Sequence, residues 1–106
     1  MITNIDKKIA QEFKSRLEQV IPVLDFRVYG SRARGKASSD SDLDIFIEVE
    51  RIDSQIRQKI SEIAWEVGFE MDRIISTFVA TRDQIINGPL GANPIMLQIE
   101  NEGIRI

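Results

Sequence analysis

The chain has 106 residues, the size of one domain, and its 42% apolar and 29% charged residues are ordinary for a globular protein. It contains neither cysteine nor histidine, which excludes disulfides, zinc sites built on these residues, thiol nucleophiles and histidine acid–base catalysis. The net charge of −3 disfavours a long nucleic acid as partner, because proteins that bind one usually present a basic surface.

The N-terminal residues 1–8 are polar and lack the apolar core of a signal peptide. No apolar run in the sequence approaches the roughly 18–20 residues that a membrane span needs. We therefore expect a cytoplasmic protein that does not enter a membrane, with residues 1–106 forming a single domain.

The first predicted elements are a helix and a short strand. Apolar residues recur every four positions near the start of the chain and predict a helix over residues 3–20. Thr3 or Asn4 can cap this helix and Pro22 ends it. Residues 26–29 then predict a strand.

A second strand is predicted over residues 43–49, which are rich in β-branched and aromatic residues. Alternation along it places the apolar odd-numbered positions on one face and puts Asp42 and Asp44 together on the other. Asp53 can cap the helix that follows, and Gly68 is expected to end it.

A third strand is predicted over residues 69–79, with Asp72 near its start. A short helix over residues 81–86 and a last helix over 94–102 complete the chain. This order predicts an α+β fold, close to α/β, with a small three-stranded mixed sheet and about four helices packed on one side of it.

Asp42 and Asp44 are the first candidates for a functional site. Their Cα atoms should lie roughly 6.5–7 Å apart on one face of a strand. Two carboxylates in this arrangement can bind one Mg²⁺ or a pair of ions, with Mn²⁺ as another hard cation of the same type. The alternative is a pair of solvated carboxylates at a strand end, which is the commoner situation for an isolated Asp-x-Asp.

Asp72 strengthens the metal interpretation, because a carboxylate in an apolar strand must be hydrogen-bonded, paired or metal-bound. Arg73 is adjacent but points to the opposite face of a strand. If the second and third strands are neighbours, Asp72 joins Asp42 and Asp44 in a site for two ions, as a metal ligand or general base.

The segment that follows the first strand is a candidate phosphate site. Gly30 lets the backbone approach an anion closely, and the N–H groups at Gly30 and Ser31 can form an anion-binding turn. Arg32 and Arg34 could neutralise the charge of a triphosphate. A plain turn and solvated arginines are the alternatives that these residues leave open.

These elements together resemble the DNA polymerase beta-like nucleotidyltransferase superfamily. Gly30-Ser31, ten intervening residues, Asp42-Leu43-Asp44 and the insert Ala33-Arg34-Gly35 carry the resemblance. It is closest to the minimal nucleotidyltransferases (MNT proteins) and extends to the C-terminal stretch from Asn93 to Ile104. The arginine at position 73 departs from the apolar residue expected after the third acid.

The resemblance implies the nucleotidyltransferase fold, phosphate binding at Gly30 and Ser31, and metal binding at Asp42 and Asp44, with Asp72 in the third acidic position. It also implies Mg²⁺-dependent transfer of AMP from ATP to a tyrosine of a HEPN-type partner protein, with the chain acting as antitoxin. A binding-only antitoxin and a transferase acting on a small molecule are the alternatives. Because residues 1–106 are expected to form a single domain, we expect a partner or an oligomer interface to supply the acceptor. Surplus apolar residues in positions 87–106 could form the docking patch.

Overall fold

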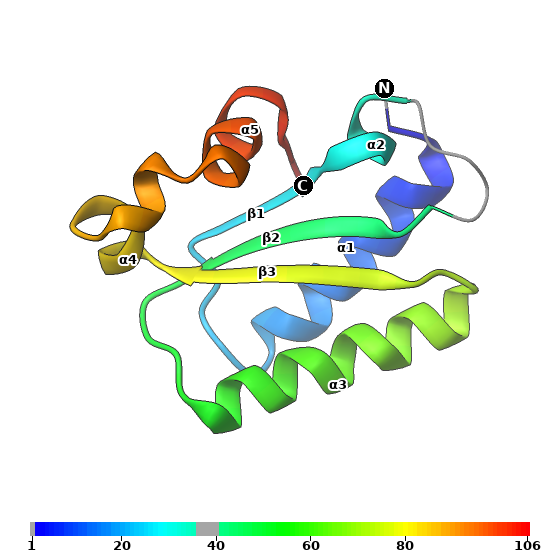
Figure 1. Ribbon diagram of the computed structural model, residues 1–106. Helices are drawn as coiled ribbons and strands as arrows, with labels where there is room; N and C mark the ends of the chain where they lie inside the picture. Colours follow the sequence, from blue (N-terminus) through cyan, green and yellow to red (C-terminus); the bar gives the residue numbers. More distant parts are fainter. Residues whose placement is uncertain (1, 36–40) are drawn as a thin grey trace.

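The computed structural model describes residues 2–35 and 41–106, and within them a four-stranded sheet forms the centre of the fold (Figure 1). The strands are β1 (Asp25–Tyr29), β2 (Leu43–Val49), β3 (Ile75–Thr81) and β4 (Ile104–Arg105), in the spatial order β3-β2-β1-β4. β1 is antiparallel to both of its neighbours, whereas β2 and β3 are parallel. The predicted α+β class with a mixed sheet is confirmed. The two-residue strand β4 was not predicted.

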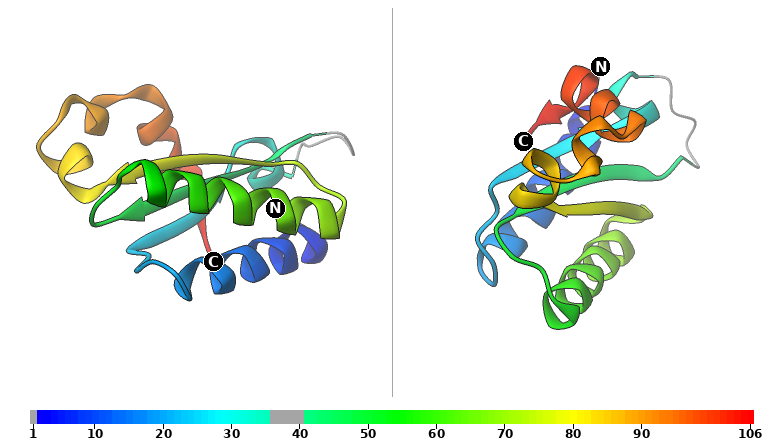
Figure 2. Two further views of the ribbon diagram at one scale, coloured as in Figure 1. Left: turned by 90° about the horizontal axis from the view of Figure 1, so that it is seen from below. Right: turned by 60° about the vertical axis from the view of Figure 1, so that its left-hand side comes forward.

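Two long helices cover one face of the sheet. They are α1 (Asn4–Glu18) and α3 (Ser54–Met71), which are in contact with each other. In Figure 1 α3 lies below the strands and α1 passes behind them, and the first view of Figure 2 shows the two helices side by side. Thr3 and Asp53 cap them by accepting hydrogen bonds from backbone N–H groups in the first turn. Their apolar stripes pack on the odd-numbered side chains of β2 to make the main core.

The other face is covered by short helices, so the expectation that all helices pack on one side was wrong. These are α4 (Arg82–Ile86), the 3-10 helix η1 (Pro89–Ala92) and α5 (Pro94–Glu102), whereas the one-turn helix α2 (Gly30–Ala33) follows β1 and contributes Ala33 to the main core. Met96 and Ile99 of α5 are buried with Phe46 and Ala80 in a second, smaller core. Phe46 is the signal for this layer, because a large apolar residue on the polar face of a strand requires a cover.

The boundary between α3 and β3 also differs from the prediction. α3 continues through Gly68 to Met71, and β3 begins only at Ile75. Gly68 does not end the helix; it lets the returning chain approach, since a Cβ there would lie 2.4 Å from the carbonyl oxygen of Arg73. The left-handed residue that ends α3 is Asp72, with φ of 56°.

Across residues 2–35 and 41–106, none of the helices combines the length and the apolar character that crossing a membrane would demand.

Candidate functional site

The predicted phosphate-binding turn and one predicted metal ligand are in contact. β1 ends at Tyr29, and Gly30 begins α2 with φ of 75°, a conformation that side-chain-bearing residues rarely adopt. Tyr29 pairs with Asp44 across the β1–β2 ladder. A Cβ added to Gly30 would lie 2.5 Å from Oδ2 of Asp44. The glycine therefore leaves room for the carboxylate directly beside the turn.

Asp42 and Asp44 stand at the beginning of β2, and Asp42 is exposed while Asp44 is partly buried. Partial burial raises the pKa of Asp44 above its ordinary value, and the negative charge of Asp42 raises it further. Arg34 acts in the opposite direction and lowers that pKa. Burial and the charge of Asp44 also raise the pKa of Tyr29. The two neighbouring carboxylates repel each other, and a cation bound between them would relieve that repulsion.

Ser31 follows Gly30 in the first turn of α2 and is partly buried. Its position beside Gly30 is compatible with the predicted contact to phosphate, which stays a prediction.

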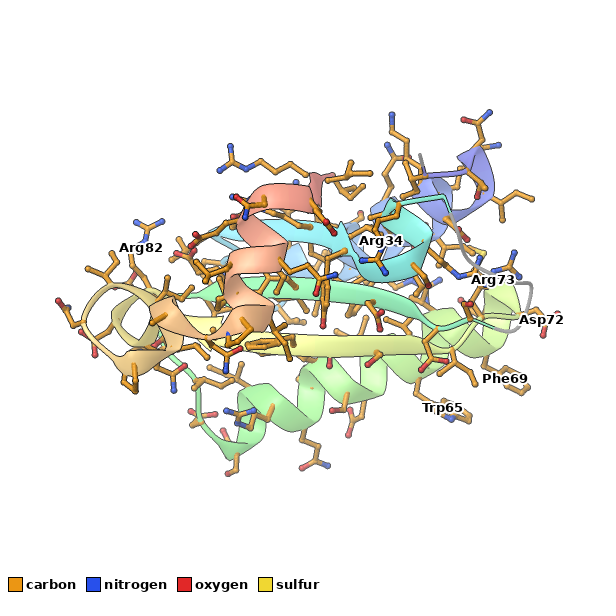
Figure 3. All side chains as sticks on the ribbon, turned by 45° about the horizontal axis from the view of Figure 1, so that its top comes forward. Arg34, Trp65, Phe69, Asp72, Arg73 and Arg82 are labelled. Atoms are coloured by element: carbon orange, nitrogen blue, oxygen red, sulfur yellow. The ribbon has the colours of Figure 1, made fainter. Side chains whose placement is uncertain are left out.

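Arg34 lies at the end of α2 on the side of the sheet that carries Asp44 (Figure 3). Its Nη1 atom is 3.2 Å from Oε2 of Glu102 in α5, and both side chains are well exposed. An exposed ion pair of this kind contributes little to stability and separates readily. Arg34 can therefore turn toward an anion bound near Gly30, as the sequence predicts.

Arg32 has a different environment from the one predicted. Its guanidinium group is buried, with its Nη1 atom 3.1 and 3.3 Å from the two carboxylate oxygens of Asp6, and it donates from Nε and Nη2 to the carbonyl oxygen of Ser41. A cation held in this way is committed to the protein, so the structure does not support its predicted role as a phosphate ligand.

Asp72 is likewise not where the sequence placed it. It is exposed at the C-terminal end of α3, three positions before β3 begins, and in Figure 3 it lies next to Arg73 at the end of the helix. The residue of β3 that pairs with Asp44 is Ser76. Within the part of the chain that the structure describes, no group of three or more acidic, cysteine or histidine residues is arranged to hold a metal ion. The expected cluster of three carboxylates was therefore wrong.

The donor set that remains fits a hard divalent cation. Mg²⁺ is commonly bound through one or two carboxylates, with substrate phosphates and water completing its shell. Asp42 and Asp44 could provide those carboxylates, and an anion bound at the turn of Gly30 would lie next to Asp44. The arrangement can thus assemble a metal–nucleotide complex from two protein carboxylates.

The sequence matches the model of the nucleotidyltransferase domain family over residues 6–101. The chain belongs to this family. The match spans nearly the whole nucleotidyltransferase domain described above, from the first turn of α1 to the end of α5. No curated protein matches its sequence.

Solved structures share the fold of this nucleotidyltransferase domain. A protein described as a minimal nucleotidyltransferase has a TM-score of 0.63 at 20% identity, covering 98% of this chain and 97% of its own. A chain of a toxin–antitoxin complex with AMP-PNP has a TM-score of 0.61 at 20% identity, and the match covers 97% of this chain and 72% of that one. A chain from the complex of a tri-AMPylated Shewanella oneidensis HEPN toxin with MNT antitoxin has a TM-score of 0.57 at 16% identity. This match covers 94% of this chain and 70% of that one.

Sequence reasoning missed Asp6, which is 1% exposed and contacts Arg32 inside the nucleotidyltransferase domain. A signal for it exists. Asp6 falls on the same helical stripe as Ala10, Phe13 and Leu17, all of them fully buried. A carboxylate on a buried stripe requires a cationic partner.

Proposed function

We propose that the chain is a Mg²⁺-dependent adenylyltransferase that transfers AMP from ATP to a hydroxyl of a partner protein and thereby acts as an antitoxin. The observation that carries this proposal is the contact between Gly30 and the carboxylate of Asp44. It supports the proposal because nucleotidyl transfer needs a turn that binds phosphate beside a carboxylate that binds metal, the two roles that we assign to Gly30 and Asp44.

The roles of the residues follow from their positions. Gly30 and Ser31 bind the phosphates of ATP. Arg34 breaks its ion pair with Glu102 and neutralises part of the phosphate charge. Asp42 and Asp44 hold Mg²⁺, with a second ion expected when the nucleotide is bound. Mg²⁺ held by these two carboxylates would supply stabilisation of the negative charge on the phosphoryl oxygens during transfer of AMP to the hydroxyl, with pyrophosphate as the leaving group. Such ATP-consuming chemistry fits a cytoplasmic location.

The partner is proposed to be a HEPN-type protein, by analogy with the solved complex that contains an AMPylated HEPN toxin. Two exposed apolar surfaces of the domain could receive it. One is the pair Trp65 and Phe69 on α3, and the other is Ile95 and Leu97 on α5. The second pair lies in the C-terminal region where the sequence predicts a docking patch, while its neighbours Met96 and Ile99 are buried. Mixed oligomers of the two proteins are expected.

The decisive experiment uses ATP labelled at the α-phosphate and the HEPN-type protein co-purified with the chain. The double substitution Asp42→Asn with Asp44→Asn should abolish transfer of label while the circular dichroism spectrum stays unchanged. Arg82→Gln is the matched control, because Arg82 is an exposed residue of α4 whose ion pair with Glu48 lies at the other end of β2. Undiminished labelling by the double variant would refute the proposal.

A binding-only antitoxin is the second candidate, and one observation favours it. Ser76 occupies the position on β3 opposite Asp44, so that strand offers no carboxylate beside the metal pair. Growth of cells that express the toxin separates the two functions. The double aspartate variant would still neutralise the toxin if binding sufficed, but not if adenylylation is required.

A further inference from the structure

A buried ion pair lies directly beneath the candidate site. Asp6, in the first turn of α1, is 1% exposed, and its backbone N–H donates to Oγ1 of Thr3. Nη1 of Arg32 lies 3.3 Å from Oδ1 and 3.1 Å from Oδ2 of Asp6. Arg32 itself is 7% exposed. Nε of Arg73 lies 3.5 Å from the same carboxylate. One acidic residue therefore contacts cations from α2 and from the connection between α3 and β3.

Hydrogen bonds connect Arg32, and the residue that follows Arg73, to the backbone on either side of Asp42. Arg32 donates from Nε and Nη2 to the carbonyl oxygen of Ser41, over 2.9 and 2.7 Å. On the other side of Asp42, the N–H of Leu43 donates over 2.8 Å to the carbonyl oxygen of Ile74, the residue after Arg73. The peptide groups on either side of Asp42 are thus fixed, while its side chain is exposed to solvent.

We propose that Asp6 is a positioning residue: together with Arg32 and Arg73 it holds the backbone on both sides of Asp42, so that this carboxylate meets the metal in a fixed orientation. This inference rests on the proposed function, because it assigns Asp42 to the metal. Asp6 cannot touch the substrate itself, since its carboxylate is covered by protein.

The alternative is that the pair only stabilises the fold. Burying two charges is a costly way to do so, because well-packed apolar residues of similar size are often equally stabilising. The arrangement of Arg32 supports positioning instead. One guanidinium nitrogen pairs with Asp6, and the other two donate hydrogen bonds to the carbonyl oxygen of Ser41. Two parallel hydrogen bonds to one carbonyl group fix the orientation of that peptide, which apolar packing alone would not do.

The test is the double substitution Asp6→Leu with Arg32→Met, which removes both charges and keeps apolar volume in the core. Arg32→Lys is the second variant, since it keeps the charge opposite Asp6 but cannot donate two parallel bonds to Ser41. Arg16→Met is the control for loss of an ion pair elsewhere. The ion pair of Arg16 with Glu70 also joins two helices, but it is exposed.

Two readouts are needed, each on protein shown to be folded by circular dichroism. The first is hydrogen exchange at the amide of Leu43, which donates to Ile74, with Val28 in β1 as the internal reference. The second is calorimetric affinity for Mg²⁺ with α,β-methylene ATP. We expect exchange at this amide to rise at least tenfold in the double variant and affinity to fall about tenfold or more. Arg32→Lys should give smaller changes in the same direction, and Arg16→Met none.

The result that would overturn the inference is exchange at the amide of Leu43 that matches the wild type in both variants. Faster exchange with undiminished nucleotide affinity would overturn it as well, since the fixed backbone would then be irrelevant to the site. Should the wild type bind no nucleotide, the proposed function fails, and the exchange data alone decide whether Asp6 holds this backbone.

Discussion

Gly30 and Asp44 belong to different strand ends, yet the carboxylate of Asp44 fills the space where a side chain on residue 30 would begin. The two positions therefore constrain each other. Because the sheet fixes Asp44, any substitution at position 30 must displace either the turn or the carboxylate.

We expect Gly30→Ala to lower nucleotide affinity by at least tenfold and stability by roughly 1–2 kcal/mol, because alanine at positive φ is strained and its Cβ would collide with Oδ2 of Asp44. Calorimetry and urea unfolding measure the two effects. Gly35→Ala carries the same backbone cost, since Gly35 has φ of 72°. Equal losses of affinity in both variants would show that the contact with Asp44 does not matter.

Asp44→Asn should stabilise the metal-free protein at neutral pH. The raised pKa of Asp44 means that the folded state binds its proton more tightly than the unfolded chain does. Asp44 therefore favours folding below its unfolded pKa of about 3.9, and this contribution is lost as pH rises through the higher folded value. Asparagine removes that loss, with a gain below about 1 kcal/mol because the side chain is partly solvated.

Urea unfolding without metal at pH 7 and at pH 3.5 measures this gain, which should be present at the first pH and absent at the second. Millimolar Mg²⁺ should stabilise the wild type and leave the variant unchanged. Destabilisation of the variant at pH 7 without metal would mean that Asp44 is held by favourable contacts in the folded state.

Asp72→Gly should leave nucleotide affinity unchanged and raise stability by up to about 1 kcal/mol. The reason is that residue 72 ends α3 in the left-handed conformation, where glycine meets no steric penalty. Parallel calorimetry and thermal unfolding measure both quantities. A large loss of affinity for Mg²⁺ and nucleotide would restore Asp72 to the metal site that the sequence predicts.

Trp65 should report the arrival of the partner. It is the chain's single tryptophan, 69% exposed, and it stacks on Phe69 with ring centroids 5.4 Å apart. Both line a cleft of about 890 Å³ between α3 and β3 that extends to Ser41, beside Asp42. A partner that brings its hydroxyl to Asp42 along this cleft would bury the indole and shift its emission to shorter wavelength.

The measurement is tryptophan emission and acrylamide quenching as a partner free of tryptophan is added. Ile86→Ala is the matched control for loss of an exposed apolar side chain, because Ile86 lies on α4 and is 68% exposed. If Trp65→Ala binds the partner as well as Ile86→Ala does, and emission does not shift in the isolated complex, the partner binds elsewhere.

Local patterns in the sequence were sufficient to predict the strands and the turn that hold Gly30 and Asp44. Alternation along residues 43–49 places Asp44 on the face opposite the core, and the glycine after β1 marks the turn. The pairing of these two elements could be expected only through the family resemblance, because nothing local in either segment specifies the other.

Asp72 was misplaced because the sequence offers competing signals between Gly68 and Ile75. A glycine usually ends a helix, and the apolar residues after it resemble a strand. The helix instead ends at Asp72 in the left-handed conformation, and Gly68 contacts the backbone of Arg73, five positions further on. The pairing of Arg32 with Asp6 is tertiary, as 26 positions separate them.

Helix α5 covers only part of the sheet face that carries Asp44. Its residues Met96 and Ile99 lie over Phe46 and Ala80, and the ion pair between Glu102 and Arg34 joins its end to the end of α2. A flat partner surface resting on α5 would be held away from the strands by the thickness of a helix, about 10 Å. A partner that rests on α5 would therefore have to present its hydroxyl on a long side chain or an extended segment, entering from the side of β3, where the residue paired with Asp44 is Ser76.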